Sequence, residues 1–361
     1  MRILVAMSGG VDSSVAAKLL TDAGNDCVGC TMKLYQNEDA GVPRSHTCCS
    51  LDDVADARSV AFGLGMPYYV FNFSDGFREK VIGRFAESYL RGETPNPCID
   101  CNRYMKFEKL FERADILGCG HIATGHYARI ERGADGLYTL RRALDPSKDQ
   151  SYVLYTMTQA QLARTLFPLG SLRKDEVREI AARSGLPTAS KPDSQDICFA
   201  PDGDYARAVE RYAGRRAEPG AFVSPDGEIL GTHRGIIHYT VGQRRGLGLS
   251  FAERRYVCGI DPVRNTVTLG REEDLLCREV ETGAFHWISG RAPDAPFACT
   301  ARLRYRQPEQ PVRVFPRPDG TALLRFDRPL RAAAPGQAAV LYQGDVVLGG
   351  GVIRRCGASL C

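Results

Sequence analysis

The chain has 361 residues, 43% hydrophobic and 25% charged, a length and composition that suit a globular protein of two or three domains with separate cores. No apolar run approaches the roughly 20 residues that cross a bilayer, and the N-terminus lacks a signal-peptide pattern, so membrane and secreted classes are disfavoured and a cytoplasmic protein is predicted. The net charge of +4 is small, but residues 274–361 carry 12 Lys and Arg against 8 Asp and Glu, so the positive excess lies at the C-terminal end.

The first part of the chain alternates predicted strands and helices. Apolar runs at 3–7, 27–34, 68–73 and 121–124 are typical of buried strands, and apolar residues at helical spacing fill the segments between them. This order predicts an α/β fold in which right-handed crossovers build a parallel sheet and ligands bind at the carboxyl ends of the strands.

The turn after the first predicted strand has the sequence Ser8-Gly9-Gly10-Val11-Asp12-Ser13-Ser14. Two adjacent glycines allow close approach of backbone N–H groups to a ligand, and Asp12 or Ser13 is expected to cap the helix that follows. An ordinary capped turn is the alternative, but three hydroxyls, two glycines and an acid exceed what a cap requires, so a phosphate cradle is favoured. The turn lacks the Gly-Lys-Ser/Thr ending of a Walker loop, and it resembles the pyrophosphate loop of the N-type ATP pyrophosphatases.

Three cysteines lie in segments predicted to be loops. Cys98 and Cys101 belong to Thr94–Asn102, where two prolines stiffen the backbone, and Asn102 is expected to cap the next helix. A thiol beside that positive helix end should have a lowered pKa, which predicts a reactive Cys101. Cys198 lies in Ser194–Phe199, and nothing in the sequence alone brings it to Cys101.

The Cys98/Cys101 pair has three interpretations: structural zinc, a redox disulfide, or sulfur and iron-sulfur chemistry. Zinc needs two further ligands, and the other close pair, Cys48-Cys49, is adjacent rather than spaced by two residues. A thioredoxin-type pair has no use for ATP. Together with the phosphate loop, the pair favours sulfur transfer.

The second half of the chain changes character. A hairpin is predicted about Asp135-Gly136, followed by helices at 159–166 and 174–184 that form a helical extension of the first domain. Beyond Gly214, short alternating runs predict a small β-rich domain and then a small barrel or sandwich. The predicted domains are 1–200, 201–273 and 274–361. Alternating Arg302, Arg304 and Arg306 form either the wet face of an edge strand or a phosphate-binding row.

Six separated motifs share a resemblance. They are Ser8–Ser14, Thr94–Asn102, Gly125–Arg129, Lys148–Tyr152, Ser194–Phe199 and Tyr239–Arg244, and in this order they closely resemble the tRNA-specific 2-thiouridylases over nearly the whole chain. The resemblance implies that ATP adenylates the C2 oxygen of the wobble uridine in tRNAs for Lys, Glu and Gln, and that sulfur then displaces AMP. Other adenylating synthetases, or an RNA-binding iron-sulfur protein with a relic ATP loop, remain the alternatives.

The resemblance also implies roles for residues. Cys198 would carry a persulfide, and Cys101 would release its sulfur or pair with it as a disulfide. Residues implied to contact ATP, with Mg²⁺, are Ala6, Met7, Ser8, Gly9, Gly10, Val11, Asp12, Ser13, Met32 and Gly125. Residues implied to contact tRNA are Asn96, Pro97, Cys98, His126, Lys148, Asp149, Gln150, Arg304, Tyr305 and Gln337. A sulfur donor protein (a cysteine desulfurase or sulfur relay) or inorganic sulfide would supply the sulfur.

One departure from the family pattern is expected to matter. Many members have Asp three residues before the nucleophile, where this chain has Cys98, so the chain resembles a cysteine-pair branch. Cys98, Cys101 and Cys198 could then hold a four-iron four-sulfur cluster with one iron open to sulfide, since cysteine is the usual ligand of such clusters. Cys48 and Cys49 are expected to be buried thiols, with a fourth cluster ligand as the alternative. The persulfide route is preferred.

Overall fold

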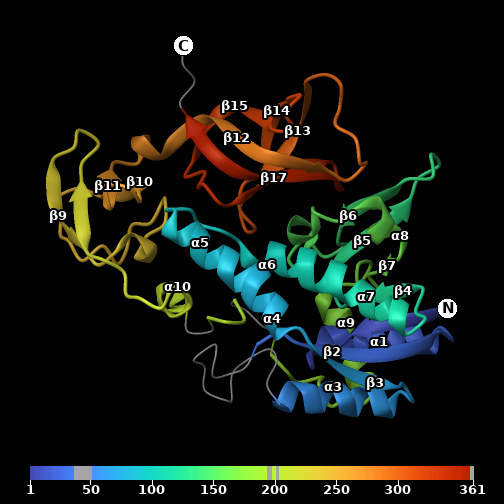
Figure 1. Cartoon of the computed structure of the whole chain (residues 1–361). Helices are drawn as coiled ribbons and strands as arrows, with labels where there is room; N and C mark the ends of the chain where they lie inside the picture. The colour runs from blue at the N-terminus through green and yellow to red at the C-terminus, as the bar shows by residue number, and fades with distance from the viewer. Residues whose placement is uncertain (36–50, 193–196, 201–202, 358–361) are drawn as a thin grey trace.

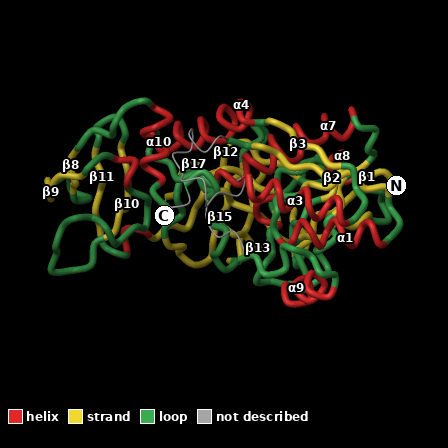
Figure 2. Tube along the Cα trace, turned by 90° about the horizontal axis from the view of Figure 1, so that it is seen from below, coloured by secondary structure: helices red, strands yellow, loops and turns green. Residues whose placement is uncertain are grey.

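The computed structural model describes residues 1–35, 51–192, 197–200 and 203–357. Three sheets organise these residues: a parallel sheet near the N-terminus, a small central sheet and a C-terminal barrel (Figure 1). The central sheet and the parallel sheet lie towards opposite ends of the molecule (Figure 2). In the part of the chain that is described, no helix has both the length and the apolar character needed to cross a membrane.

The N-terminal sheet is parallel throughout, as predicted. Its strands, in spatial order, are β3 (Tyr68–Asn72), β2 (Asp26–Lys33), β1 (Arg2–Ala6), β4 (His121–Ala123) and β7 (Thr165–Leu166). Ile3 and Val5 face a core shared with α1 (Val11–Asp22), α3 (Leu51–Gly63) and α9 (Lys174–Arg183), whereas Leu4 faces the opposite core. The two-residue alternation of buried strands therefore places helices on both faces.

The expected helix at 159–166 is wrong in its second half. The helix α8 (Gln159–Ala163) ends early, and β7 adds a fifth strand to the sheet. Ile122 donates its N–H to the Arg164 carbonyl at 2.9 Å. Pairing with the sheet edge therefore overrides the helical pattern.

Two long helical runs cross the middle of the molecule. The first comprises α4 (Ser74–Phe77), the π-helical η1 (Arg78–Gly83) and α5 (Arg84–Leu90). The second comprises α6 (Pro97–Asp100), the π-helical η2 (Cys101–Lys109) and α7 (Leu110–Ile116), with a kink at Phe107 (φ −112°, ψ 15°). π-Helical turns are rare and occur often at functional sites, so η2 is a candidate part of such a site.

The C-terminal strands form a closed barrel rather than a sandwich. In sequence they are β12 (Leu276–Trp287), β13 (Phe297–Arg302), β14 (Gln310–Pro316), β15 (Ala322–Arg331), β16 (Ala338–Gln343) and β17 (Val346–Gly357). The sheet closes because β12 pairs with both β15 and β17. The predicted hairpin, β5 (Ala128–Arg132) and β6 (Tyr138–Arg142), pairs with β17 through Arg141 and Leu140. This hairpin therefore extends the barrel sheet, although it lies within the first predicted domain, 1–200, in sequence.

The central region begins with α10 (Tyr205–Ala213), which ends at Gly214 in the left-handed conformation (φ 66°). Its sheet has the order β10 (Tyr256–Asp261), β11 (Thr266–Gly270), β8 (Gly220–Val223) and β9 (Ile229–His233). Short 3₁₀ turns are η3 (Ser151–Leu154), η4 (Ile236–His238) and η5 (Glu273–Leu275). Side chains of α5, α10 and the central sheet share one apolar core, so the central region packs directly on the helical run.

Candidate functional site

The turn between β1 and α1 is braced by its own serines. Gly9 has a φ of +76°, and a Cβ there would lie 2.3 Å from the Asp53 carbonyl oxygen, so both conformation and space require glycine. Ser13 Oγ accepts a hydrogen bond from the Ser8 N–H and donates one to the Gly10 carbonyl, each at 3.1 Å. Gly10 is the N-cap and no side chain caps α1, which corrects the expected cap by Asp12 or Ser13. An uncapped first turn is the arrangement that anion-binding helix ends use.

The Asp12 carboxylate lies at one end of this turn and is held by two residues. Tyr127 donates its hydroxyl to Oδ1 at 2.7 Å, and Lys174 Nζ lies 2.7 Å and 2.8 Å from the two carboxylate oxygens. Lys174 is only 9% exposed, and its Nζ lies 5.7 Å from the centre of the Tyr127 ring. The first turn of α1 is thereby tied to the first residue of α9.

A second lysine meets the other end of the turn. Lys191 Nζ donates to the Gly9 carbonyl at 3.1 Å and lies 2.7 Å from Asp53 Oδ1 and 2.5 Å from Asp56 Oδ2. Burial tends to lower the pKa of Lys191, but the hydrogen bonds that Lys191 donates to Asp53 and Asp56, together with the charges of these carboxylates, outweigh burial and raise the pKa. Lys191 is therefore a charged ammonium group on the Gly9 side of the turn.

Gly125 and Met32 are also predicted to contact a nucleotide. Gly125 lies against the turn, and Met32 packs on two apolar cores. A Cβ on Gly125 would lie 2.8 Å from the Ser13 nitrogen, so the backbone after β4 lies directly against α1. Met32, on β2, is half-buried and packs against two apolar cores. Gly125 thus contacts the same turn as Asp12 and Ser13, although it is more than 100 residues away in sequence.

Cys98 and Cys101 lie on a helix, not in the predicted loop. Asn96 caps α6 by accepting the Cys98 N–H at 3.1 Å, and Pro97 is the first helical residue. Asn102 does not cap a helix: its side chain is buried and donates to the Val153 carbonyl at 3.1 Å. The expected geometry around Cys101 is therefore wrong, since the residue lies inside a continuous helical run.

The expected low pKa of Cys101 is also wrong. Burial raises the pKa of this thiol to about 11, and the nearby Lys106 charge opposes that rise only in part. Cys101 is the first residue of η2 and Lys106 follows five residues later. In a π-helix, hydrogen bonds run from i to i+5, so these residues lie nearer to one face than they would in an α-helix.

Cys198 and Cys101 share an apolar environment. Both are half-buried and pack against one core that contains Phe77, Phe85 and Phe199. Tyr35 donates its hydroxyl to the Cys198 carbonyl at 2.7 Å, which fixes the backbone there. The structure thus brings to one core two cysteines that the sequence alone could not connect.

The donor geometry does not support a cluster on three cysteines. In the described ranges, no three His, Cys, Asp or Glu side chains are placed to hold one metal ion. Cys98 is exposed, whereas Cys101 and Cys198 are half-buried. Cys48, Cys49 and the start of the Ser194–Phe199 motif lie outside the described residues.

His126 is buried and neutral. Its Nδ1 lies 2.6 Å from Thr124 Oγ1 and its Nε2 lies 3.2 Å from Lys106 Nζ. Burial, helped by the Lys106 charge, lowers its pKa well below the usual range. A neutral ring accepts a hydrogen bond from the Lys106 ammonium group at Nε2, so His126 orients the charge that influences Cys101.

The Lys148–Gln150 motif faces inward in part. The Asp149 side chain is 1% exposed, accepts the N–H groups of Ala143 and Ser151, both at 3.2 Å, and lies 3.2 Å from Arg302 Nη1. Gln150 accepts the Tyr127 N–H on Oε1 at 2.9 Å. These two side chains connect the turn region with the barrel.

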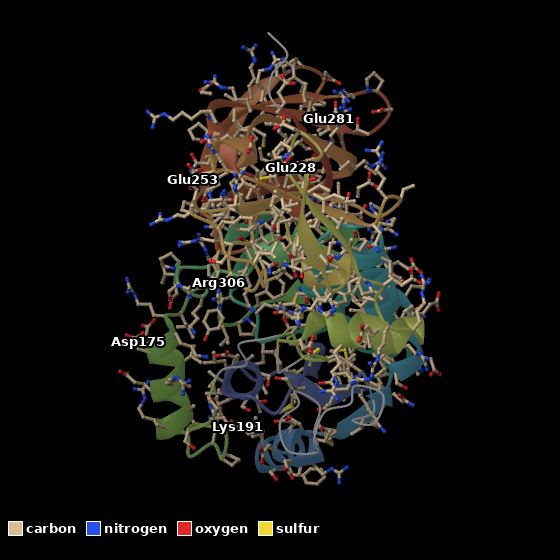
Figure 3. All side chains as sticks on the ribbon, turned by 90° about the vertical axis from the view of Figure 1, so that its left-hand side faces the viewer. Asp175, Lys191, Glu228, Glu253, Glu281 and Arg306 are labelled. Carbon is tan, nitrogen blue, oxygen red and sulfur yellow. The ribbon has the colours of Figure 1, made fainter. Side chains whose placement is uncertain are left out.

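The implied tRNA contacts of the barrel also make internal bonds. Gln337 Nε2 donates to the Thr94 carbonyl at 2.6 Å, and Arg304 Nη2 donates to the Val241 carbonyl at 2.9 Å. Burial raises the pKa of Tyr305. The expected row of arginines on one strand is wrong, because β13 ends at Arg302 and the later arginines lie on a turn. Arg306 is exposed, and Figure 3 labels it between the barrel above and the N-terminal region below.

Known proteins match almost the whole chain. A tRNA methyl transferase HUP domain model matches residues 1–202, a tRNA methyl transferase PRC-barrel domain model matches 207–271, and an aminomethyltransferase beta-barrel domain model matches 277–353. The tRNA-specific 2-thiouridylase MnmA 1 of Thermoanaerobacter sp. (strain X514) is 49% identical over 356 residues, 98% of each chain. The tRNA-specific 2-thiouridylase MnmA of Clostridioides difficile (strain 630) is 46% identical over 355 residues, again 98% of each chain.

The chain belongs to the tRNA-specific 2-thiouridylase family. Among solved structures, a 4-thiouridine synthetase in complex with RNA and ATP is 21% identical, with a TM-score of 0.37 over 59% of this chain and 51% of that chain. Membership in the 2-thiouridylase family rests on the full-length relatives.

Three lysines of this 2-thiouridylase family member were not singled out from sequence as site residues: Lys106, Lys174 and Lys191. Lys174 does carry a local signal, because it opens α9, and a positive charge is unfavourable at a helix N-terminus unless something compensates it. Lys106 and Lys191 carry no such signal. Their placement depends on a π-helical turn and on a contact with Gly9 across 182 residues.

Proposed function

We propose that this protein is an ATP-dependent tRNA-uridine 2-sulfurtransferase, which replaces the C2 oxygen of the wobble uridine in tRNAs for Lys, Glu and Gln with sulfur. The observation that carries the proposal is an identity of 46–49% to proteins named tRNA-specific 2-thiouridylases over 98% of both chains. The uncapped phosphate turn and two cysteines on one apolar core are the chemical groups that this reaction needs.

ATP activates the uridine in the first step. The C2 oxygen attacks the α-phosphorus, the bond from that phosphorus to the α,β-bridging oxygen breaks, and pyrophosphate leaves with the electron pair. The C2 oxygen then departs readily as part of AMP. N–H groups of the uncapped turn support the phosphates. The proposed nucleotide contacts are Ala6, Met7, Ser8, Gly9, Gly10, Val11, Asp12, Ser13, Met32 and Gly125.

Mg²⁺ is proposed to enter with ATP. This ion keeps several waters and is usually bound by phosphates with one or two carboxylates, so a protein site with three acidic ligands is not required. Asp12 is the carboxylate that the turn itself offers. When bound, Mg²⁺ would offset phosphate charge.

Sulfur transfer is proposed to use both cysteines. The Cys198 thiolate attacks the outer sulfur of a persulfide on a donor protein, such as a cysteine desulfurase or sulfur relay, so that the Cys198 persulfide forms and the donor thiolate leaves. Inorganic sulfide, the alternative source, would attack C2 directly without a Cys198 persulfide. The Cys101 thiolate attacks the Cys198 sulfur, the persulfide S–S bond breaks, and hydrosulfide leaves as a Cys101–Cys198 disulfide forms. Hydrosulfide attacks C2, and AMP leaves with the electrons of the C–O bond. A thiol reductant then restores both cysteines.

The charge of Lys106 supports this role for Cys101. Because burial keeps the Cys101 thiol protonated near neutral pH, formation of the nucleophile depends on the nearby ammonium group. His126 holds that group through its Nε2 atom. The implied contact of His126 with tRNA is thus proposed together with a positioning role for Lys106.

The tRNA is proposed to lie across the helical run and the barrel. The proposed contacts are Asn96, Pro97, Cys98, His126, Lys148, Asp149, Gln150, Arg304, Tyr305 and Gln337. The side chains of Asp149, Arg304 and Gln337 make contacts within the protein. We propose that they contribute to tRNA binding by shaping the surface. The exposed Arg306 and the positive C-terminal balance favour phosphate contact, and such binding should weaken with salt. The domain division 1–200, 201–273 and 274–361 and a cytoplasmic location belong to the same proposal.

The decisive experiment combines the protein, unmodified tRNA, ATP and a sulfur source, and detects 2-thiouridine by mass spectrometry of nucleosides. Wild-type protein should form it and should release AMP in a tRNA-dependent manner, which another adenylating synthetase would not do. Cys101→Ala and Cys198→Ala should abolish the product, whereas the matched control Cys258→Ala, in the central sheet, should retain it. Full thiolation by both Cys101 and Cys198 variants would contradict the mechanism.

A further inference from the structure

Two lysines from distant parts of the chain flank the proposed phosphate turn. Lys174 meets Asp12 on the first turn of α1, and Lys191 meets the carbonyl oxygen of Gly9. The separations in sequence are 162 and 182 residues, so only the fold brings these charges to the turn. Figure 3 labels Lys191 in the lower body of the molecule and Asp175, the neighbour of Lys174, on α9.

Two ammonium groups and two helix N-termini meet at this place. The first residue of α9 contacts the first turn of α1, so the positive ends of two helices of 12 and 10 residues meet there, and each lysine adds a full charge. Carboxylates hold both ammonium groups in position: Asp12 holds Lys174, and Asp53 and Asp56 hold Lys191.

An ion pair that only stabilises the fold does not need to lie at the phosphate turn. On α1, Lys18 forms a pair with Asp22 at 2.5 Å, away from the turn, and the Asp22 side chain is 55% exposed. Lys174 differs because it is nine-tenths buried, and Lys191 differs because it also bonds the backbone of the turn itself. The Lys18 pair therefore serves as a matched control for charge and helix.

We propose that Lys174 and Lys191 form a clamp that binds the β- and γ-phosphates of ATP and then the pyrophosphate product, one lysine on each side of the turn. The proposal rests on the proposed function and identifies residues that serve its first step. As the bond between the α- and β-phosphates breaks, negative charge accumulates on pyrophosphate, and two fixed cations stabilise that charge. AMP keeps only the α-phosphate, so it depends much less on the clamp.

The test measures pyrophosphate and AMP binding separately by calorimetry on the full chain. Lys174→Met and Lys191→Met should each weaken pyrophosphate binding by about 10- to 100-fold, the range for a hydrogen bond to a charged group, and should change AMP affinity by less than about threefold. Lys18→Met should change neither affinity. Lys174→Arg should recover much of the pyrophosphate affinity, because it restores the charge.

Folding is controlled within the same set. Lys174→Met removes the ammonium partner of Asp12 from a buried site and is expected to destabilise the protein more than Lys191→Met, because the Lys191 side chain is 30% exposed and that of Lys174 is 11% exposed. Lys191→Met therefore provides an independent variant. Circular dichroism and melting temperature identify variants that fold. Unchanged pyrophosphate affinity in folded variants, or equal losses for pyrophosphate and AMP, would overturn the clamp. Failure of the wild-type protein to bind ATP at all would instead overturn the proposed function.

Discussion

Replacement of Arg302 by Met should destabilise the protein strongly. The guanidinium group lies 3.2 Å from the Asp149 carboxylate, whose side chain is 1% exposed, and 3.4 Å from Glu309. Without the guanidinium group, the buried Asp149 carboxylate keeps the hydrogen bonds from the Ala143 N–H, the Ser151 N–H and the Ser151 hydroxyl, but loses its positive partner. Breaking a buried pair in this way typically costs about 3–5 kcal/mol, because the remaining carboxylate stays desolvated.

The assay is urea unfolding followed by tryptophan fluorescence. The chain has one tryptophan, Trp287 on β12, so the emission reports on the barrel to which Arg302 belongs. Met keeps an apolar stem against the Tyr342 ring, which lies 5.3 Å from the guanidinium carbon. The control is Arg291→Met: Arg291 pairs with Asp294 in solvent, with side chains 80% and 82% exposed, and its loss should leave the urea midpoint unchanged.

A second substitution tests the cause. Asp149→Asn keeps an oxygen for the N–H groups but removes the charge, so it should recover stability when combined with Arg302→Met, giving a clear coupling in a double-mutant cycle. A loss below about 1 kcal/mol for Arg302→Met would refute the reasoning. If the coupling is observed, Asp149 acts first as an internal anchor, and reduced thiolation in Asp149→Asn does not by itself identify a contact with tRNA.

Three further outcomes are expected. Alkylation of Cys101 by iodoacetamide, read by peptide mass spectrometry, should accelerate about tenfold per pH unit from about pH 7 to about pH 10, because only thiolate reacts and burial raises the pKa to about 11; a plateau below about pH 9 would contradict this. Gln337→Leu should reduce the thiolation rate more than tRNA affinity in filter binding, since its amide holds the Thr94 carbonyl at 2.6 Å, and the opposite pattern would assign it to tRNA. Gly9→Ala should abolish ATP binding in calorimetry, because its Cβ would lie 2.3 Å from the Asp53 carbonyl oxygen; normal affinity would show that the turn adapts.

The fold was predictable where hydrophobic periodicity is local. The continuous apolar run at 3–7 predicts a strand buried on both faces, and Ile3 and Leu4 do lie in opposite cores. The bounds of the strand β12 could not be predicted, because shifts in register near Thr282 interrupt its alternation. The strand β7 was missed because two residues carry no periodic signal, and only the neighbouring sheet edge selects an extended conformation.

The candidate site was predictable only where its residues are contiguous in sequence. The phosphate turn is contiguous in sequence, so its glycines and hydroxyls can be interpreted together. The pKa of Cys101 was predicted in the wrong direction, because a helix end is a local feature whereas burial depends on the whole core. Lys174 and Lys191 could not be assigned, since their partners lie more than 100 residues away.

Several residues that are predicted to contact ATP or tRNA also connect the phosphate turn to the barrel. Asp12 accepts a hydrogen bond from the Tyr127 hydroxyl. The Gln150 side chain accepts the Tyr127 N–H, and the Gln150 N–H donates to the Tyr127 carbonyl. The adjacent Asp149 pairs with Arg302 of β13. These contacts form a continuous path from Arg302 in the barrel to Asp12 in the turn. Substitutions along this path should therefore impair ATP binding and tRNA thiolation together. A joint defect indicates loss of the connection, and only a defect confined to one ligand identifies a residue that contacts it.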